Sequence, residues 1–296
     1  MKILFNFPHY PVSAGRFLAD AAKRLGHDVR TVGEPAERFN GWNKTPVAVE
    51  YVHVPDGPAQ HRFPDWTPDL VVDVDEYARP PERQRAYASV PHVAYNPSNN
   101  VCDISGPFDM TFVAAHDGPA LKADGKRVRW AGCAYDPTLH RGGKILWEDR
   151  EHDVCFIGSA WQNRQLVLRS LRAAGISVYQ DMGPIYTEYV AAYHNSRIGL
   201  VNAGDYPLCN MRLYETPAMG ALPLVARSSY DPRLRADDAL LFFDDLDSVV
   251  ETVASILACP AAGKRLLARA VAWVQPHTWD ALMKYMIESI TEVRSQ

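Results

Sequence analysis

The feature that most constrains the fold is a pattern of strand, loop, helix, glycine and strand that occurs twice along the chain. In the first copy, the apolar residues 2–7 predict a strand, and apolar residues at helical spacing then continue as far as Leu25. Gly26 follows in a helix C-cap position, and residues 27–32 predict the next strand. Such a β-α-β opening favours a parallel sheet with right-handed crossovers.

The second copy opens the second half of the chain. Residues 153–159 predict a strand that runs into a loop of small residues, and the helical pattern after it ends near Gly175. Two domains suit the length of 296 residues, because single domains usually have about 100–200. The sequence therefore predicts an α/β fold of two Rossmann-like domains that face each other across a cleft.

Apolar runs predict the remaining strands of both sheets. These runs lie at residues 68–74, 92–96, 110–114, 176–179, 198–202 and 222–225. Helical patterns at residues 186–195 and 213–220 separate the later strands. A glycine pair and a run of charges within residues 138–151 break the pattern, and we therefore place the boundary between the domains there.

Composition narrows the possible functions. The net charge of −4 does not indicate a broad basic surface for duplex nucleic acid. The 5 cysteines include no CxxC pair, which indicates neither a zinc site nor a disulfide framework, and we expect reduced thiols in a cytoplasmic protein. No apolar stretch approaches the roughly 18–20 residues of a membrane span. The sequence also lacks a GxGxxG motif and a Walker A motif, which disfavours dinucleotide coenzymes and NTPase activity.

The segment at residues 210–223 carries the most information about function. A predicted strand ends near Asn202 and a helix begins near Arg212, so a diphosphate could sit at the amides of the helix N-terminus. Arg212 can add a bidentate contact to phosphate. Glu215, about one turn later, can accept the hydroxyl groups of a ribose. An ordinary surface pair of Arg and Glu at i,i+3 explains the same spacing equally well.

This segment resembles the C-terminal domain of CgeB-like glycosyltransferases, which have the GT-B fold. The shared pattern is Asn-x-Arg-x-aromatic-Glu followed by Ala-x-Gly-Ala, at residues 210–221. The similarity extends to the strand and loop at residues 153–159 and to the His-Thr-Trp turn at residues 277–279. It also includes the segment at residues 108–137, whereas the first hundred residues match only loosely.

The resemblance implies a domain plan. Residues 1–145 would form a Rossmann-like acceptor domain, residues 146–276 a Rossmann-like donor-binding domain, and residues 277–296 a helix that crosses back to the N-terminal domain. The apolar residues that we expect on the buried face of this last helix are Leu282, Met286, Ile290 and Val293.

The resemblance also implies an activity and a donor site. The expected reaction moves a sugar from a nucleoside-diphosphate sugar, in the first instance a UDP-sugar, to an acceptor hydroxyl, with no metal and no other cofactor. The residues implied in donor binding are Gly158, Ser159, Arg164, Asn210, Arg212, Leu213, Tyr214 and Glu215. Many retaining GT-B enzymes have a Glu eight positions before the residue that corresponds to Glu215, and this chain has Pro207 at that position. Retention and inversion of the sugar therefore both stay open.

Candidate catalytic bases lie in predicted loops of the N-terminal half. They are His9, Asp75, Glu76, His116 and Asp117. An inverting enzyme would need one of them to deprotonate the acceptor, whereas a retaining enzyme can act without one. Asp75 also belongs to an Asp-Val-Asp sequence at residues 73–75, which is the DxD pattern of GT-A metal sites, but we expect it to line the cleft without a metal.

Two other functions fit the same residues. One is a nucleotide-sugar epimerase on the same fold, and the other is a catalytically silent protein that binds nucleotide sugars. For a transferase, the acceptor could be a protein, a lipid head group, a metabolite or a modified nucleobase. Transfer to an added acceptor would separate the transferase from both rivals.

Overall fold

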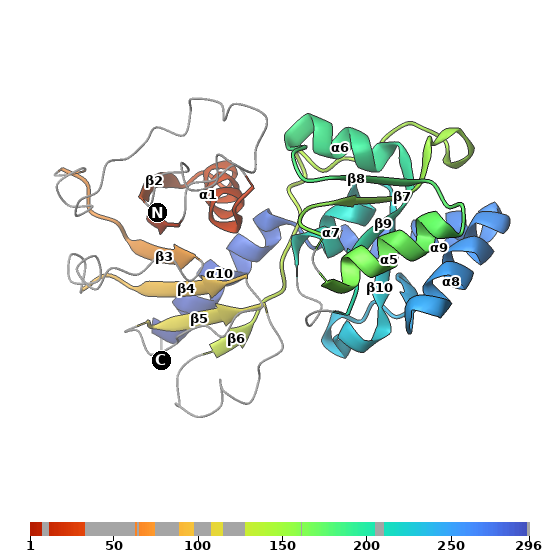
Figure 1. Cartoon of the computed structure of the whole chain (residues 1–296). Helices are drawn as coiled ribbons and strands as arrows, with labels where there is room; N and C mark the ends of the chain where they lie inside the picture. The colour runs from red at the N-terminus through yellow and green to blue at the C-terminus, as the bar shows by residue number, and fades with distance from the viewer. Residues whose placement is uncertain are drawn as a thin grey trace. The chain divides into compact units, whose positions relative to one another are not determined.

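The computed structural model describes residues 1–7, 12–32, 63, 65–74, 89–97, 108–114, 128–160, 162–204 and 210–294. They form two compact units, each with its own parallel sheet (Figure 1). Of the described residues, those up to Cys133 belong to the first unit together with the last helix, which begins at Trp279, and those from Ala134 to Thr278 belong to the second. The sequence places the first boundary after residue 145, which is later than in the structure. It places the second boundary after residue 276, which is slightly earlier than in the structure. The cleft between the two domains stays a prediction.

The first unit is built on a sheet whose described strands have the order β2-β1-β3-β4-β5-β6. The strands are β1 (Lys2–Asn6), β2 (Asp28–Val32), β3 (Leu70–Val74), β4 (His92–Asn96), β5 (Met110–Val113) and β6 (Val128–Trp130). Every neighbouring pair is parallel. The chain therefore adds strands on both sides of β1, as expected of a doubly wound α/β unit.

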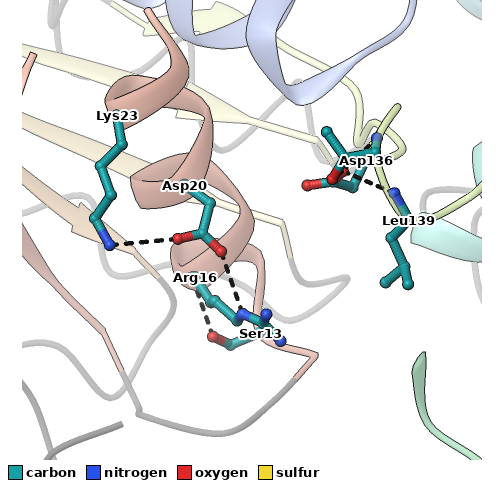
Figure 2. A network of polar contacts seen from close by, with 7 residues as sticks. Ser13, Arg16, Asp20, Lys23, Asp136 and Leu139 are labelled. Atoms are coloured by element: carbon teal, nitrogen blue, oxygen red, sulfur yellow. Dashed lines mark hydrogen bonds and ion pairs between the residues drawn. The ribbon is translucent and has the colours of Figure 1, made fainter. Parts of the chain in front are cut away.

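Helix α1 (Ala14–Arg24) connects the first two strands, as the sequence pattern predicts. Its N-cap is Ser13, whose hydroxyl accepts a hydrogen bond from the backbone N–H of Arg16 at 3.2 Å. Asp20 then accepts from the Arg16 side chain and pairs with Lys23 one turn further on (Figure 2). These pairs run along one side of the helix, while its apolar residues are buried.

The last helix, α10 (Trp279–Arg294), packs on the first unit and contacts α1 (Figure 1). The Trp279 ring is completely buried and stacks on Phe17 of α1, with ring centroids 6.0 Å apart. A second ring neighbour is Tyr95 of β4. An ion pair also joins the two helices, with Nη2 of Arg24 2.6 Å from Oδ1 of Asp280.

The buried face of α10 differs from the predicted one. Met286 and Ile290 are buried as expected. Met283 is also buried, whereas Leu282, which the sequence places on this face, is only partly buried. Val293 is also only partly buried. The buried face thus begins at Trp279, because its large ring fixes the rotation of the helix against the sheet.

The second unit has a parallel sheet of described strand order β11-β10-β9-β7-β8. The strands are β7 (His152–Ile157), β8 (Val178–Asp181), β9 (Ser196–Asn202), β10 (Leu222–Ala226) and β11 (Leu241–Phe243). The helices are α5 (Gln162–Ala173), α6 (Tyr186–His194), α7 (Met211–Ala218), α8 (Leu246–Ala258) and α9 (Pro260–Val274).

Helices cover both faces of this second sheet. Along β7, Val154 and Phe156 point into a core cluster that also contains residues of α5 and α8. The alternate residues Cys155 and Ile157 point into another cluster with Tyr193 of α6. Alternation along the central strand therefore buries both faces, which leaves the ends of the strands as the places for a ligand.

No single helix among the described residues is both long and apolar enough to cross a membrane. Helices α8 and α9 meet that test only as a pair, and they are bent by 103° at the break between them.

Candidate functional site

The end of strand β7 is shaped by Gly158. This residue has a φ of +134°, which side chains rarely tolerate, and a Cβ atom here would lie 2.5 Å from the Nη1 atom of Arg212. The Gly158 N–H donates to the carbonyl of Asp181 at the end of β8, at 2.9 Å. The strand end is therefore open enough for a guanidinium group to lie directly against the backbone.

Arg212 reaches this strand end from the first turn of α7. Its Nη1 donates to the carbonyl of Ile157 at 2.8 Å, and its guanidinium carbon lies 5.1 Å from the centroid of the Phe156 ring. Its Nε is buried and has no hydrogen-bond partner among the described residues. The ring and the carbonyl hold the cation in place.

Arg164 of α5 brings a second guanidinium group to the same place. Its Nη1 donates to the carbonyl of Ser159 at 3.1 Å, and its guanidinium carbon lies 5.9 Å from the Phe156 ring centroid. Two cations thus share one ring and hold carbonyls on either side of Gly158. Guanidinium groups beside glycine backbone suit a phosphate or diphosphate.

Asn210 is the N-cap of α7. Its Oδ1 accepts from the N–H of Leu213 at 3.2 Å, and its Nδ2 donates to the carbonyl of Val201 at 3.4 Å. Leu213 and Tyr214 are buried, and the Tyr214 ring stacks on Trp273. These side chains fix the position of the helix, and their contact with a donor stays a prediction.

Ser159 is the small residue next to Gly158. Its Oγ lies 3.7 Å from the Sδ atom of Met182, which follows strand β8. The loops after two adjacent strands thus meet beside the arginine pair. Donor binding by Ser159 stays a prediction.

Glu215 lies one turn after Arg212 and is 5% exposed. Its Oε2 accepts a hydrogen bond from the hydroxyl of Tyr189 at 2.7 Å, and its Oε1 is 3.6 Å from Nε2 of His140. Burial and the Glu215 carboxylate raise the pKa of Tyr189 well above its ordinary value. Tyr189 therefore stays protonated and donates to the carboxylate.

The sequence pattern does not point to Tyr189 or His140. Tyr189 lies in α6 and His140 in the segment before η2 (Trp147–Asp149), so neither is near Glu215 in the sequence. Only the tertiary packing of the unit brings the three together, and no spacing rule connects them.

The candidate catalytic residues His9, Asp75, His116 and Asp117, as well as Glu76, lie outside the described residues. Asp73 is described, and its Oδ1 accepts from Nδ2 of Asn6 at 2.8 Å. The described residues contain no cluster of three His, Cys, Asp or Glu side chains suited to a metal ion. Because Asp75 is not among them, metal independence stays a prediction.

The comparison with family models matches most of the second unit and part of α10. Residues 144–288 match the family model described as "Glycosyl transferase-like". No curated protein matches the chain. The matched span includes both arginines and Glu215, so the candidate site lies inside a glycosyl transferase-like domain.

Several solved structures share the fold of the chain at low sequence identity. Sucrose-phosphate synthase from Thermosynechococcus elongatus is similar at a TM-score of 0.70 with 11% identity, over 99% of each chain. An alpha-glucosyltransferase in complex with UDP and a 13-mer DNA containing an HMU base is similar at a TM-score of 0.69 with 14% identity. The match covers 98% of this chain and 99% of that one. HepE from Anabaena in complex with UDP and glucose is similar at a TM-score of 0.65 with 12% identity. The match covers 99% of this chain and 100% of that one.

The similar structures show that the chain has the GT-B fold, and residues 144–288 match a glycosyl transferase-like domain. This result confirms the predicted fold class. The CgeB-like subfamily within that class stays a prediction.

Proposed function

We propose that this protein transfers a sugar from a nucleoside-diphosphate sugar, UDP-linked in the first instance, to an acceptor hydroxyl without a metal ion. The second unit holds the donor and the first unit holds the acceptor. The observation that carries the proposal is the pair Arg164 and Arg212, which converge on the end of β7 around Gly158.

The pair suits the chemistry of the donor. When the glycosidic bond to the donor phosphate breaks, negative charge develops on the leaving diphosphate. Fixed cations lower the energy of that charge more than they lower the energy of the bound donor, which is what accelerates the reaction. Arg212 is already fixed by Phe156 and Ile157, so little reorganisation is needed at that moment.

The nucleoside is held by the next turn of the same helix. Glu215 has its carboxylate one turn after Arg212, and this spacing supports ribose binding next to the diphosphate. Two of the structurally similar proteins have UDP bound, and this supports a uridine nucleotide in the proposed donor.

The acceptor is proposed only as a hydroxyl compound. Among the similar structures, one contains DNA and another contains glucose. The net charge of −4 gives less support to duplex DNA, because binding of the phosphate backbone depends on many cationic contacts.

The direct test is calorimetry with UDP on the unmodified protein and on Arg212→Met. We expect measurable binding by the unmodified protein and a loss of roughly 10- to 100-fold in the variant, which corresponds to one or two charge-assisted hydrogen bonds. Arg169→Met is the matched control, because Arg169 lies on the exposed side of α5 and bonds only to Gln165 among the described residues. Equal affinities in all three proteins would contradict the proposed site.

Release of UDP from UDP-sugars then tests catalysis. Release that depends on an added hydroxyl acceptor supports transfer. Interconversion of the sugar without an acceptor would indicate an epimerase, and binding without any turnover would indicate a silent binding protein.

A further inference from the structure

The carboxylate of Glu215 is held from two sides by residues that come from other parts of the second unit. We propose that Tyr189 and His140 are positioning residues that orient this carboxylate toward the two hydroxyl groups of a ribose and so select ribonucleotide over 2′-deoxyribonucleotide donors. The inference rests on the proposed function.

Tyr189 fixes one carboxylate oxygen. Its hydroxyl lies 2.7 Å from Oε2 of Glu215, which is the distance of a strong hydrogen bond to a charged acceptor. The tyrosine ring is itself held in α6, with its centroid 4.9 Å from that of Tyr193, which is completely buried. The Tyr189 hydroxyl therefore has a fixed position from which it restrains the rotation of the carboxylate.

His140 faces the other oxygen with a defined tautomer. The backbone N–H of Asp136 donates to Nδ1 of His140 at 3.0 Å, so Nδ1 carries no proton and the neutral ring carries it on Nε2. That Nε2 lies 3.6 Å from Oε1 of Glu215, and the His140 side chain is 2% exposed. The ring thus presents an N–H to the carboxylate.

The turn that holds His140 is itself rigidly bonded. Oδ1 of Asp136 accepts from the backbone N–H of Thr138 at 2.7 Å. It also accepts from the backbone N–H of Leu139 at 3.2 Å (Figure 2). These bonds close the turn and aim the Asp136 N–H at the imidazole. The orientation of His140 is therefore set by the backbone and does not depend on a ligand.

With these two contacts made, the Glu215 carboxylate can still accept further hydrogen bonds. A carboxylate offers about four lone-pair directions, two on each oxygen. Tyr189 uses one on Oε2 and His140 faces one on Oε1, so each oxygen retains one direction for a further donor. Two such acceptors match the 2′ and 3′ hydroxyl groups of a ribose, whereas a 2′-deoxyribose leaves one of them without a partner.

A purely structural role explains less of this arrangement. Arg164 of α5 and Arg212 of α7 donate to the carbonyls of Ser159 and Ile157. Glu215 instead lies against Tyr189 and His140. A buried carboxylate is a costly way to stabilise a helix contact, because its charge loses contact with water. Its position one turn from Arg212 instead places it where a nucleoside would follow a diphosphate.

The experiment compares UDP with 2′-deoxy-UDP by calorimetry. We expect the unmodified protein to bind UDP about tenfold more tightly or better, since one buried charge-assisted hydrogen bond is lost with the deoxy ligand. Tyr189→Phe is expected to weaken UDP binding by about tenfold but to change 2′-deoxy-UDP binding far less, so the preference for ribose falls. Tyr179→Phe is the matched control, because Tyr179 lies on β8 and stacks on His152, and it should keep the preference.

His140 gives an independent pair of variants. In His140→Gln the amide N–H can replace Nε2–H, so the ribose preference should be retained, whereas His140→Leu should reduce it. This pair decides the question if Tyr189→Phe fails to fold. Equal losses for both ligands in Tyr189→Phe and in His140→Leu would overturn the proposed positioning role while leaving the donor site in place. Absence of UDP binding in the unmodified protein would instead overturn the proposed function, and this inference with it.

Discussion

The Nη1 atom of Arg212 lies 2.8 Å from the carbonyl oxygen of Ile157, so the first turn of α7 is bonded to the end of β7. The bond joins the two segments that form the proposed donor site, the strand end and the helix N-terminus. It is possible because Gly158 has no side chain to fill the space that the guanidinium group occupies. The integrity of this contact should therefore govern how well the site binds a nucleotide.

Gly158→Ala should weaken UDP binding as well as stability. The new Cβ would meet Nη1 of Arg212 at 2.5 Å, and a non-glycine residue at φ +134° adds roughly 1–3 kcal/mol of backbone strain. Gly175→Ala is the control, since Gly175 also has a positive φ but a Cβ atom there would meet nothing within 4 Å among the described residues. Chemical denaturation and calorimetry should show lower stability in both variants and weaker UDP binding only in Gly158→Ala.

Glu215→Ala should weaken nucleotide binding by about 1–3 kcal/mol through the lost ribose hydrogen bonds. The protein should remain folded, although the Tyr189 hydroxyl loses its acceptor. Glu188→Ala is the matched control, because Glu188 is an exposed residue of α6 on the same unit. Calorimetry with UDP that gives the same affinity for Glu215→Ala and the unmodified protein would refute ribose binding by Glu215.

Turnover of a UDP-sugar should persist in EDTA. The proposed mechanism stabilises the leaving diphosphate with Arg164, Arg212 and helix amides, and a divalent cation would be redundant there. Rates of UDP release should be compared before and after chelation. Loss of activity that manganese or magnesium restores would move the mechanism toward metal assistance, with Asp73 and Asp75 as the first residues to test.

The strands were predictable where an apolar run has clear ends. The predicted strand at residues 92–96 is β4, with the same bounds. The predicted strand at residues 176–179 instead begins at Val178, because the N–H of Ile176 donates to the carbonyl of Leu171 and so completes the end of α5. The apolar character of Ile176 could not distinguish helix packing from a strand.

Helices α8 and α9 were not predicted, although the first has a readable start. Asp245 and Ser248 form a reciprocal capping box at the N-terminus of α8. Arg212 and Glu215 could be proposed from the sequence because they lie one turn apart within a single motif. Tyr189 and His140 were not, because a hydrogen bond between distant segments leaves no periodic signal in a single sequence.

The last helix gives a sharp test of side-chain periodicity against packing. The sequence favours Leu282 as a core residue, whereas the structure buries Met283 completely and leaves Leu282 partly exposed. Truncating a buried methionine to alanine typically costs about 2–5 kcal/mol, and truncating a partly exposed leucine costs less because part of its surface is already in contact with water. Met283→Ala should therefore lower the free energy of unfolding clearly more than Leu282→Ala, as measured by urea denaturation.

Because α10 packs on the first unit, both variants should retain UDP binding by the second unit. A larger loss of stability in Leu282→Ala would mean that α10 is rotated on the sheet, and that Trp279 does not set its orientation.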